Sequence, residues 1–518
     1  MRTLPWLTLL TFTPALGGVL LLLLPKHRQA LSRLIALGAS LLTAGLALGV
    51  ASQFDPSVLG MQLVERHEWI RDLGVHYFLA VDGLSLLMLG LTVVLVPYAI
   101  LVSWGIQHKP GLFFSLVLFL ETGLLGTFTA LNFFHWFIFW ELGLLPAFFL
   151  VKGWGGKQRG FAANQFFLYT LAGSVAMLLA FQAIFLATGT FDFLELSSRA
   201  QEGRLTSSLV AWVGWLEMPP KLIVMLVFLG VFLGFAVKVP LVPFHIWLPS
   251  AYTEAPTGVA MLLTGAMSKM GVYGFLRILA PLFPEQMQWF RTPLLILAIV
   301  TIVYGAWTAM AQTDLKRILA YSSINHLGYC LLGIFAAVTA TDQPPAGVME
   351  GSAILAGVLL QMLNHGLTAA TLFGLVGWLE TRAGGIRHID RFGGLRSILP
   401  VYTGITGIAL FSSLGLPGLN GFIGEFLIFK GTFGLAPWAA GAAVAGLLLT
   451  AIFILTLILK VFHGPLKEEW RGLTDLSQGE RYLLMPVVGL MLLLGIYPQV
   501  VLRWINVTVT HLLAQINY

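Results

Sequence analysis

The sequence is poor in charged residues and in cysteine. Only 10% of its 518 residues are Asp, Glu, Lys or Arg, whereas 58% are apolar and 12% are aromatic. Soluble globular proteins carry about 25% charged residues. The composition of this chain therefore excludes a soluble globular protein. It also excludes a disordered chain, which would be poor in apolar residues. The single cysteine, Cys330, excludes an internal disulfide and a thiolate-ligated zinc or iron–sulfur site.

Signatures of nucleotide binding are also missing. The sequence has no CxxC pair, no Walker A string and no GxGxxG. The glycine-rich string at 415–421 lies inside an apolar segment, where glycines favour close packing or a helix break. We therefore expect no cofactor and no metal in this chain, and we assign any redox cofactor to another subunit. The net charge of +6 is dispersed between apolar runs, which argues against a nucleic-acid partner.

The sequence contains many long apolar runs. A spanning helix needs about 20 apolar residues, and the runs predict an all-α, polytopic membrane protein of about 14 transmembrane helices. The predicted spans are 4–24, 34–50, 83–104, 112–131, 133–151, 164–188, 222–248, 259–282, 292–310, 318–338, 352–379, 400–433, 438–462 and 482–502.

The distribution of Lys and Arg predicts the orientation of these spans. Of the 29 such residues, 17 fall in the loops after the odd-numbered spans, 9 fall in the opposite loops and termini, and three lysines lie within spans. Because cytoplasmic loops are enriched in Lys and Arg, both termini are expected on the non-cytoplasmic side. The polar stretch 51–82 is too long for a turn and is expected to form a small structured cap.

Several ionisable side chains fall within predicted spans, namely Glu121, Glu141, Lys238, Lys269, His326, His365 and Glu425. Each charge near the bilayer centre costs about 2.5–3.5 kcal/mol. The alternative interpretation of any single one, Glu121 or His326 above all, is a polar group satisfied within a helix bundle. Four together cost about 10 kcal/mol, comparable with the stability of a whole fold. This total favours a function for the set.

The residue types indicate proton transfer. Acids, lysines and histidines all exchange protons, and a Glu–Lys pair whose separation changes can pass a proton onward. A row of such groups is typical of a pump or antiporter. A transporter of organic solutes would more often have one central site with aromatic walls.

Two predicted spans contain helix breaks beside an ionisable residue. Pro240 and Pro243 follow Lys238 in span seven. Pro417, Gly418 and Gly421 precede Glu425 in span twelve and lie at its predicted break. Freed carbonyl groups are tolerated in lipid only where protein or water satisfies them, so each break indicates an internal hydrated cavity.

The breaks are five spans apart, which predicts two inverted five-helix repeats, spans 4–8 and 9–13. The resulting organisation has four parts. They are 1–111 with three spans and the cap at 51–82, 112–282 with the first half-channel, 289–462 with the second half-channel, and 463–518 with the last span and a tail.

Seven strings along nearly the whole chain resemble the antiporter-like subunits of complex I. They are V-D-G-L-S at Val81, F-W-E-L-G-L-L-P around Glu141, F-A-V-K-V-P-L-V-P-F-H-I-W-L-P around Lys238, S-K-M-G-V-Y-G at Ser268, D-L-K-R-I-L-A-Y-S-S-I-N-H-L-G at Asp314, N-H-G-L at Asn364 and G-F-I-G-E-F at Gly421. The acid at position 425 is similar to the NuoM type, called NdhD in cyanobacteria and chloroplasts and subunit 4 in mitochondria.

The resemblance implies a role for each residue of the row. Glu141 and Lys238 would form the coupling pair, Lys269 would be the central proton carrier, and Glu425 would pass protons to the far side. His326 and His365 would continue the hydrated path. His245 and Glu254 would lie near the cytoplasmic mouth as secondary candidates, and Glu121 matches no family position, so its assignment rests on burial alone.

The resemblance further implies a proton-translocating subunit of an NAD(P)H or ferredoxin:quinone oxidoreductase. NAD(P)H or ferredoxin, the iron–sulfur clusters and the quinone would then be bound by other subunits, and the partners would be the membrane-arm and quinone-module subunits, the lipid bilayer and protons. The membrane would be a bacterial inner membrane or a cyanobacterial thylakoid. A subunit of a multisubunit Na⁺/H⁺ antiporter and a stand-alone solute transporter remain alternatives.

Overall fold

The computed structural model describes residues 4–25, 28–212, 219–340 and 346–516. Within these ranges thirteen helices are long and apolar enough to cross a membrane. They are α1 (Trp6–Leu23), α2 (Gln29–Gln53), α3 (Gly83–Val102), α4 (Pro110–Thr129), α5 (Phe133–Trp154), α6 (Arg159–Thr188), α9 (Pro220–Lys238), a continuous helix over 257–282, α15 (Arg291–Met310), α16 (Leu315–Ala337), α17 (Ala346–Arg382), α20 (Pro437–Phe462) and α21 (Gln478–Ile496). The prediction of a largely helical membrane protein is confirmed.

The helix over 257–282 contains two π-helical turns. Its parts are α11 (Thr257–Leu262), η4 (Leu263–Met267), α12 (Ser268–Gly274), η5 (Phe275–Leu279) and α13 (Ala280–Leu282), of which η4 and η5 are π-helical. Turns of this kind inside α-helices occur often at functional sites. This helix is buried along its whole length, and α16 is buried almost as fully.

Predicted span twelve, 400–433, is two short helices. They are α18 (Pro400–Leu414) and α19 (Asn420–Leu435). Pro417 and Gly418 lie in the break, as predicted. Gly421 is the second residue of α19, so its placement at the break is wrong by a few residues.

The remaining elements lie between or after the long helices. They are β1 (Gln62–Ile70), η2 (Arg71–Leu73), β2 (Val75–Val81), α7 (Phe193–Gln201), α8 (Arg204–Trp212), α10 (Trp247–Glu254), α14 (Pro284–Trp289), η7 (Ile389–Arg391), η8 (Leu395–Ser397), η9 (Glu468–Trp470) and α22 (Gln499–Ile516). The predicted cap is thus an antiparallel hairpin of β1 and β2. The sequence did not predict α7, α8 or α22, which are short or have apolar residues on one side only.

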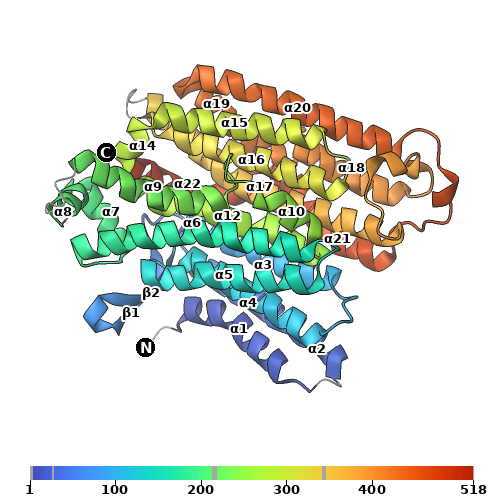
Figure 1. Ribbon diagram of the computed structural model, residues 1–518, viewed down its shortest axis with the longest axis horizontal. Helices are drawn as coiled ribbons and strands as arrows, with labels where there is room; N and C mark the ends of the chain where they lie inside the picture. Colours follow the sequence, from blue (N-terminus) through green and yellow to red (C-terminus); the bar gives the residue numbers. More distant parts are fainter. Residues whose placement is uncertain (1–3, 26–27, 213–218, 341–345, 517–518) are drawn as a thin grey trace.

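Figure 1 shows the long helices side by side, with α1 and α2 at one edge of the bundle and α20 at the opposite edge. The hairpin, α7 and α8 gather at one end of the bundle, where α1 begins and α22 ends (Figure 1). Glu65 of β1 fixes the hairpin to α1, because its carboxylate accepts hydrogen bonds from the backbone N–H groups of Leu7 and Thr8 at 2.7 and 3.0 Å. Those groups have no partner within the helix.

Candidate functional site

The first helix break directly follows Lys238, the last residue of α9. Pro240 and Pro243 lie in the non-helical stretch between α9 and α10, as the sequence predicts. Side chains replace the missing helical hydrogen bonds there. Trp247 Nε1 donates to the Val237 carbonyl at 2.9 Å, and Thr301 Oγ1 accepts from the Val242 N–H at 3.1 Å.

Lys238 is buried against an aromatic ring. Its side chain is 2% exposed, and Nζ lies 4.8 Å from the ring centroid of Trp140 on α5. Trp140 is next in sequence to Glu141. Lys238 Nζ and Glu141 Oε1 are both buried without a hydrogen-bond partner among the described residues. Lys238 thus lies beside the residue that precedes Glu141, and among the described residues no hydrogen bond joins the two predicted partners.

Lys269 lies in α12, directly after the first π-helical turn. It has no exposed surface. Its Nζ is 2.7 Å from His365 Nδ1 and donates to the Thr264 carbonyl at 2.6 Å. Since the contact with His365 joins two groups that can both bind a proton, it can carry one from α12 to α17.

A second set of contacts leads from His365 to Glu425. The rings of His365 and His326 are 5.3 Å apart between centroids. His326 Nδ1 lies 2.9 Å from Glu425 Oε1, and Gln361 Nε2 donates to the same oxygen at 3.0 Å. His326 Nε2 is 2.9 Å from Ser413 Oγ. The side chains of Lys269, His365, His326 and Glu425 are all buried. Their contacts join these four sequence-predicted residues into one connected series.

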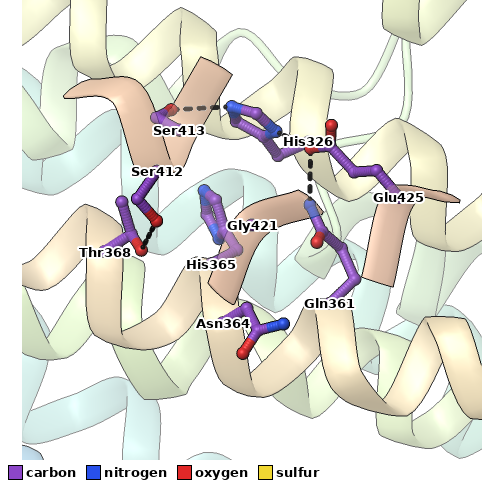
Figure 2. A pocket seen from close by; sticks show the side chains of 9 residues that line it. All are labelled: His326, Gln361, Asn364, His365, Thr368, Ser412, Ser413, Gly421 and Glu425. Atoms are coloured by element: carbon purple, nitrogen blue, oxygen red, sulfur yellow. Dashed lines mark hydrogen bonds and ion pairs between the residues drawn. The ribbon is translucent and has the colours of Figure 1, made fainter. Parts of the chain in front are cut away.

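A small cavity adjoins this series (Figure 2). His326 and His365 point toward it, as do Gln361 and Glu425. Its volume is about 10 Å³, which is room for about one water molecule. The lining residues are His326, Gln361, Asn364, His365, Thr368, Ser412, Ser413, Gly421 and Glu425. The polar lining provides the several hydrogen-bond partners that such a water requires.

The second break is held by a polar network between α17 and α19. Asn364 Nδ2 donates to the Asn420 carbonyl at 2.6 Å, and Asn420 Nδ2 donates to the Asn364 carbonyl at 3.2 Å. Ser412 Oγ donates to Asn420 Oδ1 at 2.5 Å. A Cβ atom at Gly421 would collide with the Ser412 carbonyl oxygen. The glycine therefore allows α19 to begin directly against the end of α18.

The two secondary candidates near the first break lie apart from the series. His245 stacks edge-on against Tyr304 with ring centroids 4.9 Å apart, and its Nδ1 is buried without a partner among the described residues. Glu254 accepts a hydrogen bond from the Gln158 N–H at 2.8 Å, just before α6 begins. This contact gives Glu254 a structural role at the turn between α5 and α6.

Glu121 also lies apart from the series. It is in α4, has no exposed surface, and neither carboxyl oxygen has a hydrogen-bond partner among the described residues.

Lys430 also takes no part in the series. It is five residues after Glu425, which places it on a different face of α19, and it forms an ion pair of 3.1 Å with Glu350.

Sequence reasoning missed several polar groups at or near the site. Gln361 and Ser413 are neutral, so they carry no charge signal within an apolar segment. Asp82 and Arg277 form a buried ion pair of 2.5 Å between the start of α3 and η5. Asp82 lies within the V-D-G-L-S string, and that string was the one signal that could have found the pair. Among the described residues, no group of three or more His, Cys, Asp or Glu could hold a metal ion.

Three comparisons relate this chain to known proteins. Residues 130–452 match the family model described as NADH:quinone oxidoreductase/Mrp antiporter, TM. The chain is 37% identical to NADH-quinone oxidoreductase subunit M of Rhodobacter capsulatus, over 98% of this chain and 96% of that protein. It is 34% identical to NAD(P)H-quinone oxidoreductase chain 4 1 of a Synechococcus strain, over 99% and 94%.

Two solved structures have the same fold. One is a chain of respiratory complex I from Thermus thermophilus with bound NADH, with a TM-score of 0.83, 30% identity and coverage of 99% of this chain and 100% of that one. The other is a chain of the Mrp complex from Dietzia, with a TM-score of 0.82, 20% identity and full coverage of both chains. At 20% sequence identity, the similarity to the Mrp chain shows a shared fold and nothing more.

Proposed function

Because the chain belongs to the NADH:quinone oxidoreductase/Mrp antiporter membrane family, we propose that it is the proton-translocating subunit M of an NADH-quinone oxidoreductase. The subunit would lie in the membrane arm of the complex beside other membrane subunits. Electron transfer from NADH or ferredoxin to quinone would take place on cofactors that other subunits hold. Sequence relatives at 32–37% identity over 96% or more of this chain carry oxidoreductase names, and they support this proposal over an Na⁺/H⁺ antiporter.

The observation that carries the proposal is the buried series from Lys269 to Glu425. Lys269 Nζ contacts His365 at 2.7 Å, and His326 contacts Glu425 at 2.9 Å. A purely structural bundle has no need for a lysine, two histidines and a glutamate in one buried row, since each costs free energy there. Every member can bind and release a proton.

The proposed path moves a proton in three steps. A protonated Lys269 amine gives its proton to His365 Nδ1, which leaves the amine neutral. The proton then passes between the two imidazoles, with a water in the adjoining cavity bridging the rings. His326 finally gives it to the Glu425 carboxylate, which releases it beyond the second break.

The Glu141–Lys238 pair would control the loading of Lys269. Lys238 ends α9 and has no hydrogen-bond partner for Nζ among the described residues, so its ammonium can move toward or away from the Glu141 carboxylate. When the pair is apart, the charge on Lys238 repels a proton on Lys269 and favours its transfer to His365. His245 would belong to the proposed entrance on the cytoplasmic side, and Glu254, which holds the turn between α5 and α6, would lie at its edge.

The proposed orientation places both termini outside the cytoplasm. The Lys and Arg counts support this orientation. The start of α1 and the end of α22 lie at the same end of the bundle (Figure 1), which supports the placement of both termini on one side of the membrane. The membrane proposed is the inner membrane of a bacterium or the thylakoid of a cyanobacterium.

The proposal is tested with the assembled complex in sealed vesicles. Glu141→Gln keeps the size of the side chain but removes its charge, and it is expected to lower the protons pumped per electron while NADH oxidation by the complex continues. An assembled Glu141→Gln complex that pumps with the wild-type ratio would contradict the proposed function.

A further inference from the structure

Glu121 is a buried carboxyl that the proposed path does not use. It has no exposed surface, and both of its oxygens lack a hydrogen-bond partner among the described residues. An ionised carboxylate without a partner is very costly in an apolar interior, so such a group stays neutral by holding a proton. A carboxyl in these surroundings can hold one proton.

Another buried acid of this chain shows the contacts that a carboxylate with a structural role makes. Asp82 is as deeply buried as Glu121, but it caps α3 by accepting from the Ser85 N–H and forms a 2.5 Å ion pair with Arg277. Glu121 has neither kind of contact. Its position therefore has no structural explanation of the kind that Asp82 has.

Three contacts set the depth of Glu121 relative to the path. Tyr273 OH donates to the Phe128 carbonyl at 3.2 Å, which places Phe128 of α4 level with Tyr273. A Cβ atom at Gly123 would lie 2.5 Å from the Gly143 nitrogen, and one at Gly143 would lie 3.4 Å from Met270. Residues 123 and 128 of α4 are thus level with about 270 and 273, and the two helices run in the same direction.

This register brings Glu121 to the depth of the proposed proton carriers. At 1.5 Å of rise per residue, Glu121 and Lys269 lie within about one helical turn of each other in depth. Glu141 is within about 6 Å by the same measure. Glu121 is seven residues before Phe128, so it is on the side of α4 that meets Tyr273 and the helix of Lys269.

We propose that Glu121 is a further proton-carrying residue of the first half-channel, one that reloads Lys269 after Lys269 has passed its proton to His365. The carboxyl O–H bond breaks, the proton crosses by way of water, and an N–H bond forms on the neutral Lys269 amine. The products are a carboxylate and an ammonium ion, which attract each other. The carboxylate then regains a proton from the cytoplasmic side. The assignment rests on the proposed function, because it supplies a proton to the same path.

The test measures protons pumped per electron by the complex in proteoliposomes. Glu121→Gln fills the same space but holds no transferable proton, and it is expected to lower the ratio while the complex assembles normally. Glu121→Asp keeps a carboxyl and is expected to recover part of the loss. Glu350→Gln, which removes a paired acid in α17, is the matched control and is expected to keep the wild-type ratio.

A second measurement reports the protonated state directly. Dicyclohexylcarbodiimide enters apolar sites and reacts with protonated carboxyls, so mass spectrometry is expected to find its adduct on Glu121 and none on the ion-paired Glu350. A wild-type ratio in Glu121→Gln, or no adduct on Glu121, overturns the assignment. If Glu141→Gln is impaired in the same assay, only the Glu121 assignment fails; if it also keeps the wild-type ratio, the proposed function fails.

Discussion

Glu425 is the residue whose surroundings best explain its place in the proposed path. One of its oxygens contacts His326 at 2.9 Å and accepts from Gln361 at 3.0 Å. These contacts satisfy one oxygen of the carboxylate inside the bundle, and the adjoining cavity has room for about one water molecule beside it. A buried acid with such partners can change its protonation without unfolding its surroundings.

The variant Glu425→Gln is expected to lower proton pumping several-fold with little loss of stability. The amide can keep one hydrogen bond to His326 or Gln361, but it cannot accept a proton from the imidazole. The measurement is the ratio of protons pumped to NADH oxidised in vesicles, with Glu350→Gln as the control. Full coupling in Glu425→Gln would place the exit elsewhere.

The ionisable residues of the site could be found from the sequence, and their neutral partners could not. Lys269, His326, His365 and Glu425 stand out because charge is costly in apolar segments. The contacts that join them depend on how α12, α16, α17 and α19 pack, which a single sequence does not encode locally. Gln361 is as close to Glu425 as His326 is, but amides are common in soluble and membrane helices alike.

Each helix break depends on contacts between whole helices. At the second break, Asn364 of α17 and Asn420 of α19 exchange hydrogen bonds between side chain and backbone. This exchange ties the start of α19 to the middle of α17 and so fixes the position of the helix that follows the break. Both breaks were predictable, because Pro and Gly mark them in the sequence. The residue at which α19 begins was not predictable. Gly421 lies inside α19, where it allows the helix to pack closely against Ser412, and it does not form part of the break.

Gly421→Ala is expected to destabilise the junction of α18 and α19. The added methyl group would collide with the Ser412 carbonyl oxygen, and overpacking of this kind costs about 1–3 kcal/mol. The measurement is the midpoint of thermal unfolding of the purified complex, together with its pumping ratio. Gly441→Ala in α20, where a Cβ atom meets nothing within 4 Å, is the control. Equal midpoints for the two variants would contradict this interpretation of the break.

At the scale of the whole molecule, a few buried polar contacts join distant parts of the chain. Asp82 and Arg277 connect the start of α3 to η5, and the Gly83 N–H donates to Thr508 of α22 at 2.8 Å. That the fold consists of many long apolar helices was predictable from composition and run length. These long-range connections were not predictable, because they join residues that are far apart in the sequence. The helix α22 was missed because its apolar residues lie on one side only and do not form a continuous apolar run.

Arg277→Ala is expected to reduce assembly of the complex strongly. It leaves the Asp82 carboxylate buried without its partner, and breaking a buried pair in this way costs about 3–5 kcal/mol. The amount of intact complex in native gels measures the effect. Lys460→Ala breaks a surface pair with Asp390, which is worth about 1 kcal/mol or less, and serves as the control. Normal assembly of the Arg277 variant would show that the pair does not join the two segments.

The central claim is that protons cross this subunit by binding to and leaving Lys269. Lys269→Arg tests it most directly, because arginine keeps the positive charge but does not release its proton in proteins. The measurement is protons translocated per electron by the assembled complex in proteoliposomes. The account predicts continued NADH oxidation with a lowered ratio, and a wild-type ratio in the Lys269→Arg complex would contradict it.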